Sequence, residues 1–100
     1  MIRITKDVVR EAYERGVIKL DVDPDFGTST VARIGDDWFY FNDIPADDMK
    51  PEEYKNNVPE ERIVTCIFNT LDEFNFEDAD KYAYYEILLD DALSRQEEVH

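Results

Sequence analysis

A stripe of apolar residues with helical spacing opens the chain. The stripe runs over residues 8–13, so we expect a first helix of about ten residues there. Thr5 has the side chain of a helix N-cap, and Gly16 suits a left-handed C-terminal cap. A helix this short is marginal alone, so it must pack against another element.

Residues 17–41 change to the alternating period of strands. Ile18, Leu20 and Val22 fall on one face of a first strand over residues 17–22, and residues 28–34 and 38–41 are expected to form two more. Turn-forming residues separate these segments, which predicts an antiparallel meander. Because residues 38–41 are all aromatic, large rings should lie on both faces of the last strand, so both faces need cover.

The second half of the chain returns to helical spacing. Pro51 and Pro59 each precede a pair of glutamates, a pattern typical of a helix start. The first predicts a short helix that ends near Asn57, and the second predicts a longer helix with a core stripe. That stripe consists of Ile63, Val64, Ile67, Phe68, Leu71 and Phe74. A break at residues 75–78 should separate it from a last helix that ends near Gln96.

The last helix has more apolar surface than one core-facing stripe requires. Its predicted buried face consists of Tyr85, Leu88, Leu89 and Ala92. Tyr84 and Ile87 fall outside this face, so we expect them at the surface. The whole pattern predicts a single α+β domain over residues 1–100: an N-terminal helix, a three-stranded antiparallel β-meander, and two or three C-terminal helices packed on the sheet.

Charge is distributed unevenly and sums to −14, from 25 acidic and 11 basic residues. Residues 1–19 carry +2, residues 20–50 carry −6, residues 51–70 carry −2 and residues 71–100 carry −8. A surface of this sign repels polyanions, so direct nucleic-acid binding is not expected. A membrane span is not expected either, because no apolar run approaches about 18 residues.

Asp21, Asp23 and Asp25 alternate like the acids that open an EF-hand loop. The glycine and the glutamate that such a loop needs further along are replaced by Phe26 and Ala32. One interpretation is a strand end that runs into a turn, with Asp23 and Asp25 bonded to the local backbone. The other is a weak divalent-cation site in a small enzyme or metal protein. We expect the turn, and therefore no metal or other cofactor.

A catalytic signature is missing from the sequence. Cys66 flanks the core stripe and has no internal histidine to activate it, and His100 is the last residue. The three glycines are at turns and form no phosphate-binding loop. We therefore expect a protein that is not an enzyme. A single cysteine and the lack of a signal stretch favour a cytoplasmic location.

The acidic residues are numerous enough to match the charge of a nucleic acid. A compact domain of this length has a diameter of roughly 33 Å, and that length of duplex DNA holds roughly 19 phosphates, about half of them on one side. Residues 21–48 and 71–98 contain eighteen acids, with runs at Asp47-Asp48, Asp72-Glu73 and Asp90-Asp91.

In its small size, single domain, acidity and aromatic residues among acids, the chain resembles phage-encoded inhibitors of host nucleases, the DNA-mimic antirestriction and anti-CRISPR proteins. The resemblance implies occlusion, in which carboxylates fill the Lys/Arg groove of a basic partner and aromatics supply an apolar anchor. The partner would be a basic nucleic-acid-binding protein, such as an RNA-guided nuclease. The residues predicted to bind it are Asp47, Asp48, Asp72, Glu73, Tyr84, Glu86, Ile87, Asp90 and Asp91.

A different class of function stays open beside this one. The two-sided aromatic strand and the apolar last helix are also typical of a structural or oligomerising accessory domain. In that case the acidity only solvates the protein, and Trp38 or Ile87 would be buried in a homodimer.

Overall fold

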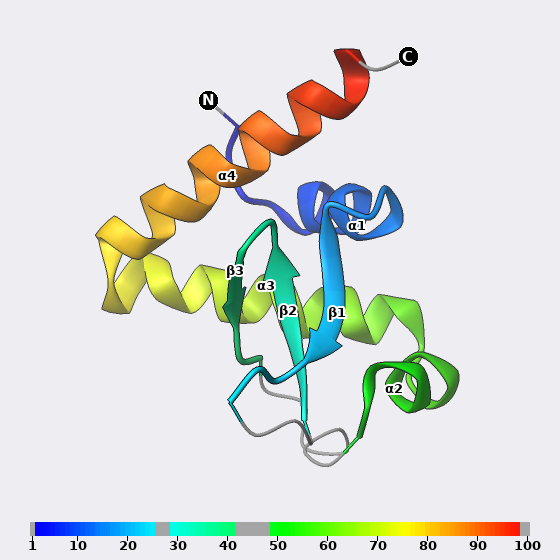
Figure 1. The fold of residues 1–100 in the computed structure, drawn as a ribbon. Coiled ribbons are helices and arrows are strands. Elements are labelled where there is room, and N and C mark those ends of the chain that lie inside the picture. Colours follow the sequence, from blue (N-terminus) through cyan, green and yellow to red (C-terminus); the bar gives the residue numbers. More distant parts are fainter. Residues whose placement is uncertain (1, 26–28, 42–48, 99–100) are drawn as a thin grey trace.

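The computed structural model describes residues 2–25, 29–41 and 49–98 of the chain (Figure 1). Its elements, in chain order, are α1 (Lys6–Glu14), β1 (Ile18–Val22), β2 (Thr30–Ile34), β3 (Asp37–Phe39), α2 (Pro51–Asn57), α3 (Glu60–Glu77) and α4 (Ala79–Glu98). This order confirms the predicted α+β class, with one helix before a three-stranded antiparallel sheet and further helices after it.

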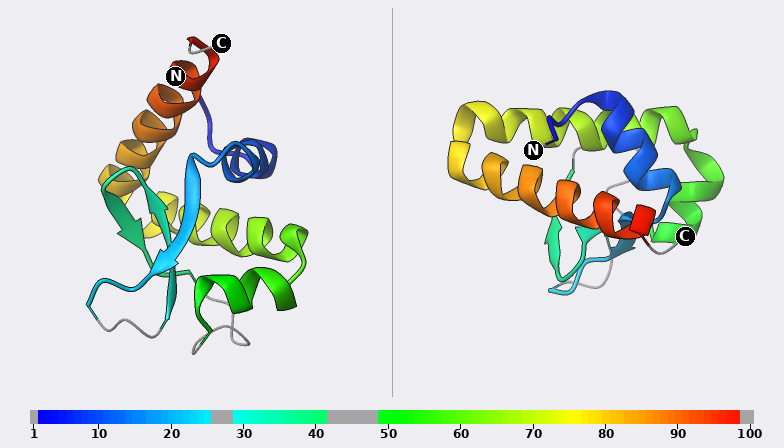
Figure 2. Two further views of the ribbon diagram at one scale, coloured as in Figure 1. Left: turned by 45° about the vertical axis from the view of Figure 1, so that its right-hand side comes forward. Right: turned by 90° about the horizontal axis from the view of Figure 1, so that it is seen from above.

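The sheet has the strand order β1-β2-β3, and both pairings are antiparallel. In its register Leu20 lies opposite Ala32, and Ala32 lies opposite Phe39, so these buried side chains share one face. In Figure 1, α3 lies behind the sheet and α4 crosses the end of the sheet where β2 turns into β3. Figure 2 shows the helices gathered on one side, which leaves the opposite face of the sheet without a helix.

Aromatic contacts join the sheet to the two long helices. The ring of Phe39 lies 6.0 Å from that of Phe74 in α3 and 5.2 Å from that of Tyr85 in α4, measured between centroids. Tyr54 of α2 is fully buried and packs edge-on against Phe41. The predicted core stripes of α3 and α4 are confirmed, because their central residues are buried and their flanking residues are half-buried against the core.

The ends of the first helix follow the local chemistry that predicted them. The Thr5 hydroxyl accepts a hydrogen bond of 3.2 Å from the backbone N–H of Val8, which makes Thr5 the N-cap of α1. Gly16 has a φ of 77°, the left-handed conformation that glycine adopts without steric penalty. In α2, Pro51 stands at the first helical position, and the helix ends at Asn57 as expected.

Two element boundaries differ from the predicted ones. The break was expected over residues 75–78, but α3 ends at Glu77 and α4 begins at Ala79, so only Asp78 lies between the helices. The last turn of α3 stays helical because Phe74 packs against Tyr85. The last strand was expected over 38–41 but covers Asp37–Phe39. At that end of the sheet Thr30 donates its hydroxyl hydrogen bond to the carbonyl of Met49, so the segment before α2 takes the place of a longer β3.

The four consecutive aromatics divide between the two faces of the sheet. Phe39 is buried in the core and Phe41 packs against it, whereas Trp38 is half-buried and Tyr40 exposed on the outer face. Trp38 and Tyr40 meet edge-to-face with centroids 5.2 Å apart. The described helices therefore cover the inner face as expected, but none of them covers the outer face, where Tyr40 stays exposed.

Candidate functional site

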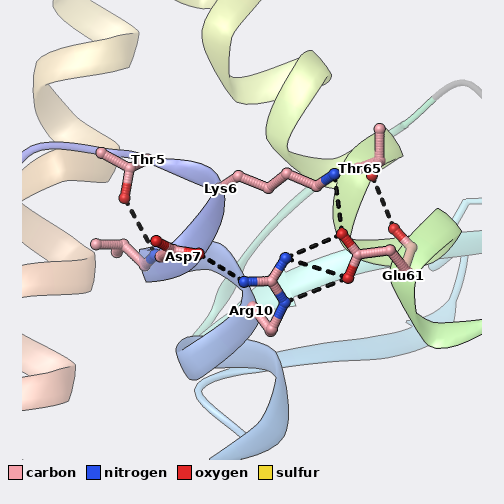
Figure 3. A network of polar contacts seen from close by, with 7 residues as sticks. Thr5, Lys6, Asp7, Arg10, Glu61 and Thr65 are labelled. Atoms are coloured by element: carbon pink, nitrogen blue, oxygen red, sulfur yellow. Dashed lines mark hydrogen bonds and ion pairs between the residues drawn. The ribbon is translucent and has the colours of Figure 1, made fainter.

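Two basic residues of the N-terminal segment, Lys6 and Arg10, are held in ion pairs between α1 and α3. Lys6 Nζ lies 2.9 Å from Glu61 Oε1, and Arg10 Nη2 lies 2.9 Å from the same oxygen. Figure 3 shows both side chains reaching the single carboxylate of Glu61, while Arg10 also pairs with Asp7. Hydrogen bonds from Arg10, and then from Lys6, lower the pKa of Glu61 to about 2. The positive charges of Lys6 and Arg10 are thus compensated by acids of the protein itself.

Three other arginines are engaged in the same way. The pairs are Arg15 with Glu11, Arg33 with Asp21 and Arg95 with Asp91, each with a nitrogen–oxygen distance of 3.0 Å. Because these bases are occupied by the protein's own acids, the charge left facing outward is dominated by the remaining carboxylates.

Acidic residues, including the Asp91 that pairs with Arg95, are concentrated in the hairpin of α3 and α4. Residues 72–91 contain eight acids and one base, Lys81, which gives a net charge of −7 (−8 + 1). The ammonium of Lys81 lies 4.4 Å from the ring centroid of Phe74, so it is turned toward an aromatic face of the protein. The hairpin therefore carries half of the total charge of −14.

The outer face of α4 combines exposed apolar side chains with carboxylates. We use the name α4 outer face for Asp80, Tyr84, Ile87 and Asp91, which the helical repeat brings to the side away from the core. Tyr84 is 45% exposed and Ile87 is 53% exposed, as the sequence predicted. Exposed aromatic and aliphatic side chains ringed by charge are typical of a contact surface for a protein.

A contact between α4 and β3 fixes the position of Tyr84. Its hydroxyl donates a short hydrogen bond to a carboxylate oxygen of Asp37, the first residue of β3. That bond, together with partial burial and the negative charge of Asp37 and Asp36, raises the pKa of Tyr84. The β2–β3 turn thereby adds the carboxylates of Asp36 and Asp37 to the edge of the α4 outer face.

The predicted partner-binding residues do not form one surface. Asp72 of α3 and Glu86 of α4 line the same groove, whereas Glu73 is exposed on α3, one residue further around the helix. Asp90 is half-buried and lies between the groove side and the outer face of α4. Asp47 and Asp48 lie outside the described residues.

Phe76 is an exposed residue that the sequence reasoning missed. It is the most exposed of the large apolar side chains in the described part of the chain, at 82%. The signal was present, because Phe76 follows Ile67 by nine residues and so lies half a turn away from the core stripe. It stands at the corner of the α3–α4 hairpin, next to Glu77 and Asp78.

The alternating acids near residue 23 are explained by a turn. Asp23 is only 2% exposed, and its Oδ1 accepts a hydrogen bond of 2.7 Å from the backbone N–H of Asp25. Its carboxylate also accepts a hydrogen bond from Tyr40, which raises the pKa of that tyrosine. Asp21 is paired with Arg33. Within residues 2–25, 29–41 and 49–98, no group of three ligating side chains is arranged to hold a metal ion.

Cys66 and His100 are the two other residues that the sequence analysis considered for chemistry. Cys66 is half-buried on α3, as expected from its position beside the core stripe, and His100 lies outside the described residues. None of the described helices is both long and apolar enough to cross a membrane. No family model, no curated protein and no solved structure matches this chain. The geometry and charge of the molecule itself are therefore the observations that bear on its function.

Proposed function

We propose that this chain is a non-enzymatic binding protein that covers the nucleic-acid-binding surface of a basic partner. The observation that carries the proposal is the α4 outer face, where Tyr84 and Ile87 are exposed between carboxylates. The carboxylates would occupy the Lys and Arg side chains that otherwise bind phosphates, and the two apolar side chains would anchor the contact. A nuclease, including an RNA-guided one, is a partner of this kind.

The dimensions of the hairpin fit this role. A 20-residue helix such as α4 is about 30 Å long, and duplex DNA of that length holds roughly 18 phosphates, of which one side presents about nine. The α3–α4 hairpin contains eight acids in residues 72–91, and Asp36 and Asp37 lie at its edge. Eight acids are close in number to the phosphates on one side of a duplex, but they are divided between the α4 outer face, the groove and the exposed side of α3.

The test is an affinity capture from a lysate, washed first at low and then at high salt, with partners identified by mass spectrometry. We expect a nucleic-acid-binding protein that is retained at low salt and displaced by added DNA or RNA. Retention should fall at high salt, because the screening length shortens from about 10 Å at 0.1 M salt to about 3 Å at 1 M. Binding that is insensitive to salt, or unaffected by competing nucleic acid, would contradict the proposal.

Charge reversal at the α4 outer face provides the matched comparison. The double variant Asp80→Lys/Asp91→Lys changes the net charge by +4 beside Ile87, and Glu52→Lys/Glu53→Lys makes the same change on the exposed side of α2. We expect the first variant to lose the partner and the second to keep most of the binding. Equal losses would mean that net charge alone, rather than this face, attracts the partner.

A homodimer is the alternative that a specific observation favours. Trp38 and Tyr40 form an edge-to-face pair on the sheet face that the helices leave open. A second copy could cover this pair, although a charge of −14 on each chain opposes self-association. Sedimentation at micromolar concentration, compared between the natural protein and Trp38→Ser, separates the two cases. A natural protein that sediments as a dimer, together with a Trp38→Ser variant that sediments as a monomer, would favour the accessory-domain function.

A further inference from the structure

A groove of about 610 Å³ lies between the extended N-terminal segment and the two helices of the hairpin. Its volume is in the range that accommodates a side chain or a small ligand. Residues that line it include Ile2, Arg3, Phe68, Asp72, Tyr82 and Glu86. The groove is on a different side of α4 from Tyr84 and Ile87, because Tyr82 and Glu86 lie toward α3 and the chain start.

The two carboxylates in the groove have no partner among the residues that the structure describes. Asp72 and Glu86 are half-buried, and neither has a hydrogen bond or an ion pair with any residue that the structure describes. A cation that enters the groove would pair with these carboxylates through charge-assisted hydrogen bonds. Burial, followed by the charges of Glu86 and Asp72, raises the pKa of the Tyr82 hydroxyl between them.

The groove also supplies flat apolar surface beside these charges. Phe68 and Tyr82 are half-buried, and both pack against the core while part of each ring faces the groove. An arginine side chain has an apolar stem and a planar cation that stacks on aromatic rings and bonds carboxylates with two parallel N–H groups. Aromatic rings next to two unpaired carboxylates therefore complement arginine more closely than any other side chain.

Arg3 already shows that a guanidinium is tolerated here. It lines the same groove, and its positive charge lowers the pKa of Tyr82 against the effect of the carboxylates. Arg3 itself is exposed and forms no ion pair within the described residues, whereas Lys6 on the same wall is engaged by Glu61. A second guanidinium from outside could take the position between the carboxylates.

We propose that this groove binds one arginine side chain of a protein partner, with its guanidinium between Asp72 and Glu86 and its stem on Tyr82 and Phe68. The inference rests on the proposed function for the identity of the partner, which would be drawn in by the carboxylates of the hairpin. It assigns to Asp72 and Glu86 a role separate from that of the α4 outer face.

The experiment is an NMR titration of the full chain with a short capped peptide that contains one arginine, and with the same peptide containing neutral citrulline. We expect the arginine peptide to shift the amide signals of Phe68, Asp72, Tyr82 and Glu86 with saturation, and the citrulline peptide to leave them unchanged. Asp72→Asn/Glu86→Gln should weaken binding about tenfold or more, since two charge-assisted hydrogen bonds are lost.

The control for that variant changes two residues of α3 outside the groove. Glu73→Gln/Glu77→Gln removes the same amount of charge from exposed positions of α3, and it should leave the affinity within about twofold. Arg3→Ala should tighten binding of the arginine peptide by removing a competing cation, whereas Lys19→Ala, an equal charge change at an exposed position of β1, should have a smaller effect. Circular dichroism would verify that each variant is folded.

Two outcomes of the NMR titration would overturn the inference. One is a set of shifts spread over the α4 outer face with none in the groove, and the other is equal weakening by the two double variants. Because the peptide titration uses no partner protein, its failure is distinguishable from failure of the proposed function. In the capture experiment, Asp80→Lys/Asp91→Lys could lose the partner while Asp72→Asn/Glu86→Gln keeps it. That result would uphold the proposed function and refute arginine binding in the groove.

Discussion

The rotation of α4 about its own axis decides which of its side chains can meet a partner. Two substitutions, two residues apart on this helix, test that rotation. Leu89 has no exposed surface and belongs to the core, whereas Ile87 is 53% exposed on the opposite side of the same helix. Truncation of each to alanine removes a similar aliphatic side chain. The two variants should therefore differ in stability only because of where their side chains point.

The expected loss for Leu89→Ala is about 3 kcal/mol, within the range of 2–5 kcal/mol for a leucine deleted from a core. For 100 residues the entropy of unfolding is about 0.2 kcal/mol per kelvin, so the midpoint of thermal unfolding should fall by about 15 °C. Ile87→Ala should change the free energy of unfolding by no more than about 0.5 kcal/mol, because alanine favours the helix and little buried area is lost. That corresponds to less than about 3 °C.

The assay is thermal unfolding followed by far-UV circular dichroism, repeated in urea to verify that the dependence on denaturant is unchanged. If Ile87→Ala destabilises the protein as much as Leu89→Ala, the helix is rotated from the position described, and the α4 outer face is not a surface. If Ile87→Ala is neutral for stability and also abolishes capture of the basic partner, the side chain is an anchor rather than a structural residue.

Three further predictions concern ionisable groups. Glu61→Gln should destabilise the protein at neutral pH and low salt, and the difference should vanish as the pH falls from about 4.5 to about 2, since the lowered pKa of Glu61 stabilises the fold only while the carboxylate is charged. Thermal midpoints of the two proteins between pH 7 and pH 2 measure this, and a constant difference would contradict it. Burial, with the charge of Asp37, raises the pKa of Tyr85 to about 12, so its contribution to stability is complete below pH 10 and is lost between about pH 10 and pH 12. A spectrophotometric alkaline titration should show tyrosine ionisation near pH 12, and Tyr85→Phe should reduce the amplitude of that phase by one tyrosine. Asp23→Ala should lower the free energy of unfolding by about 2 kcal/mol, because the backbone N–H of Asp25 loses a charged acceptor, whereas Asp25→Ala should change it by less than about 0.5 kcal/mol in urea unfolding.

Local chemistry in the sequence determined the elements and most of their ends. The hydroxyl of Thr5, the positive φ of Gly16 and the proline at position 51 act within a few residues of themselves, so each could be interpreted without the rest of the chain. The outward position of Ile87 was predictable for the same reason, because a helical repeat alone separates it from Leu89.

Contacts between distant segments decided the rest. The sequence could not choose which pair of aromatics in residues 38–41 would be buried, because that depends on which face of the sheet Tyr85 and Phe74 approach. The basic N-terminal segment was visible as charge, but the pairing of Arg10 with Glu61, 51 residues later, was not.

The candidate surfaces show the same division. Acidic composition identified the carboxylates of residues 72–91, yet adjacent acids such as Asp72 and Glu73 point to different sides of α3. Whether Asp72 meets Glu86 depends on how α3, α4 and the chain start pack together. Sequence spacing specifies the face of a helix on which a side chain lies, and only packing specifies what that face meets, because the energy of tertiary contacts is shared among residues far apart in the chain.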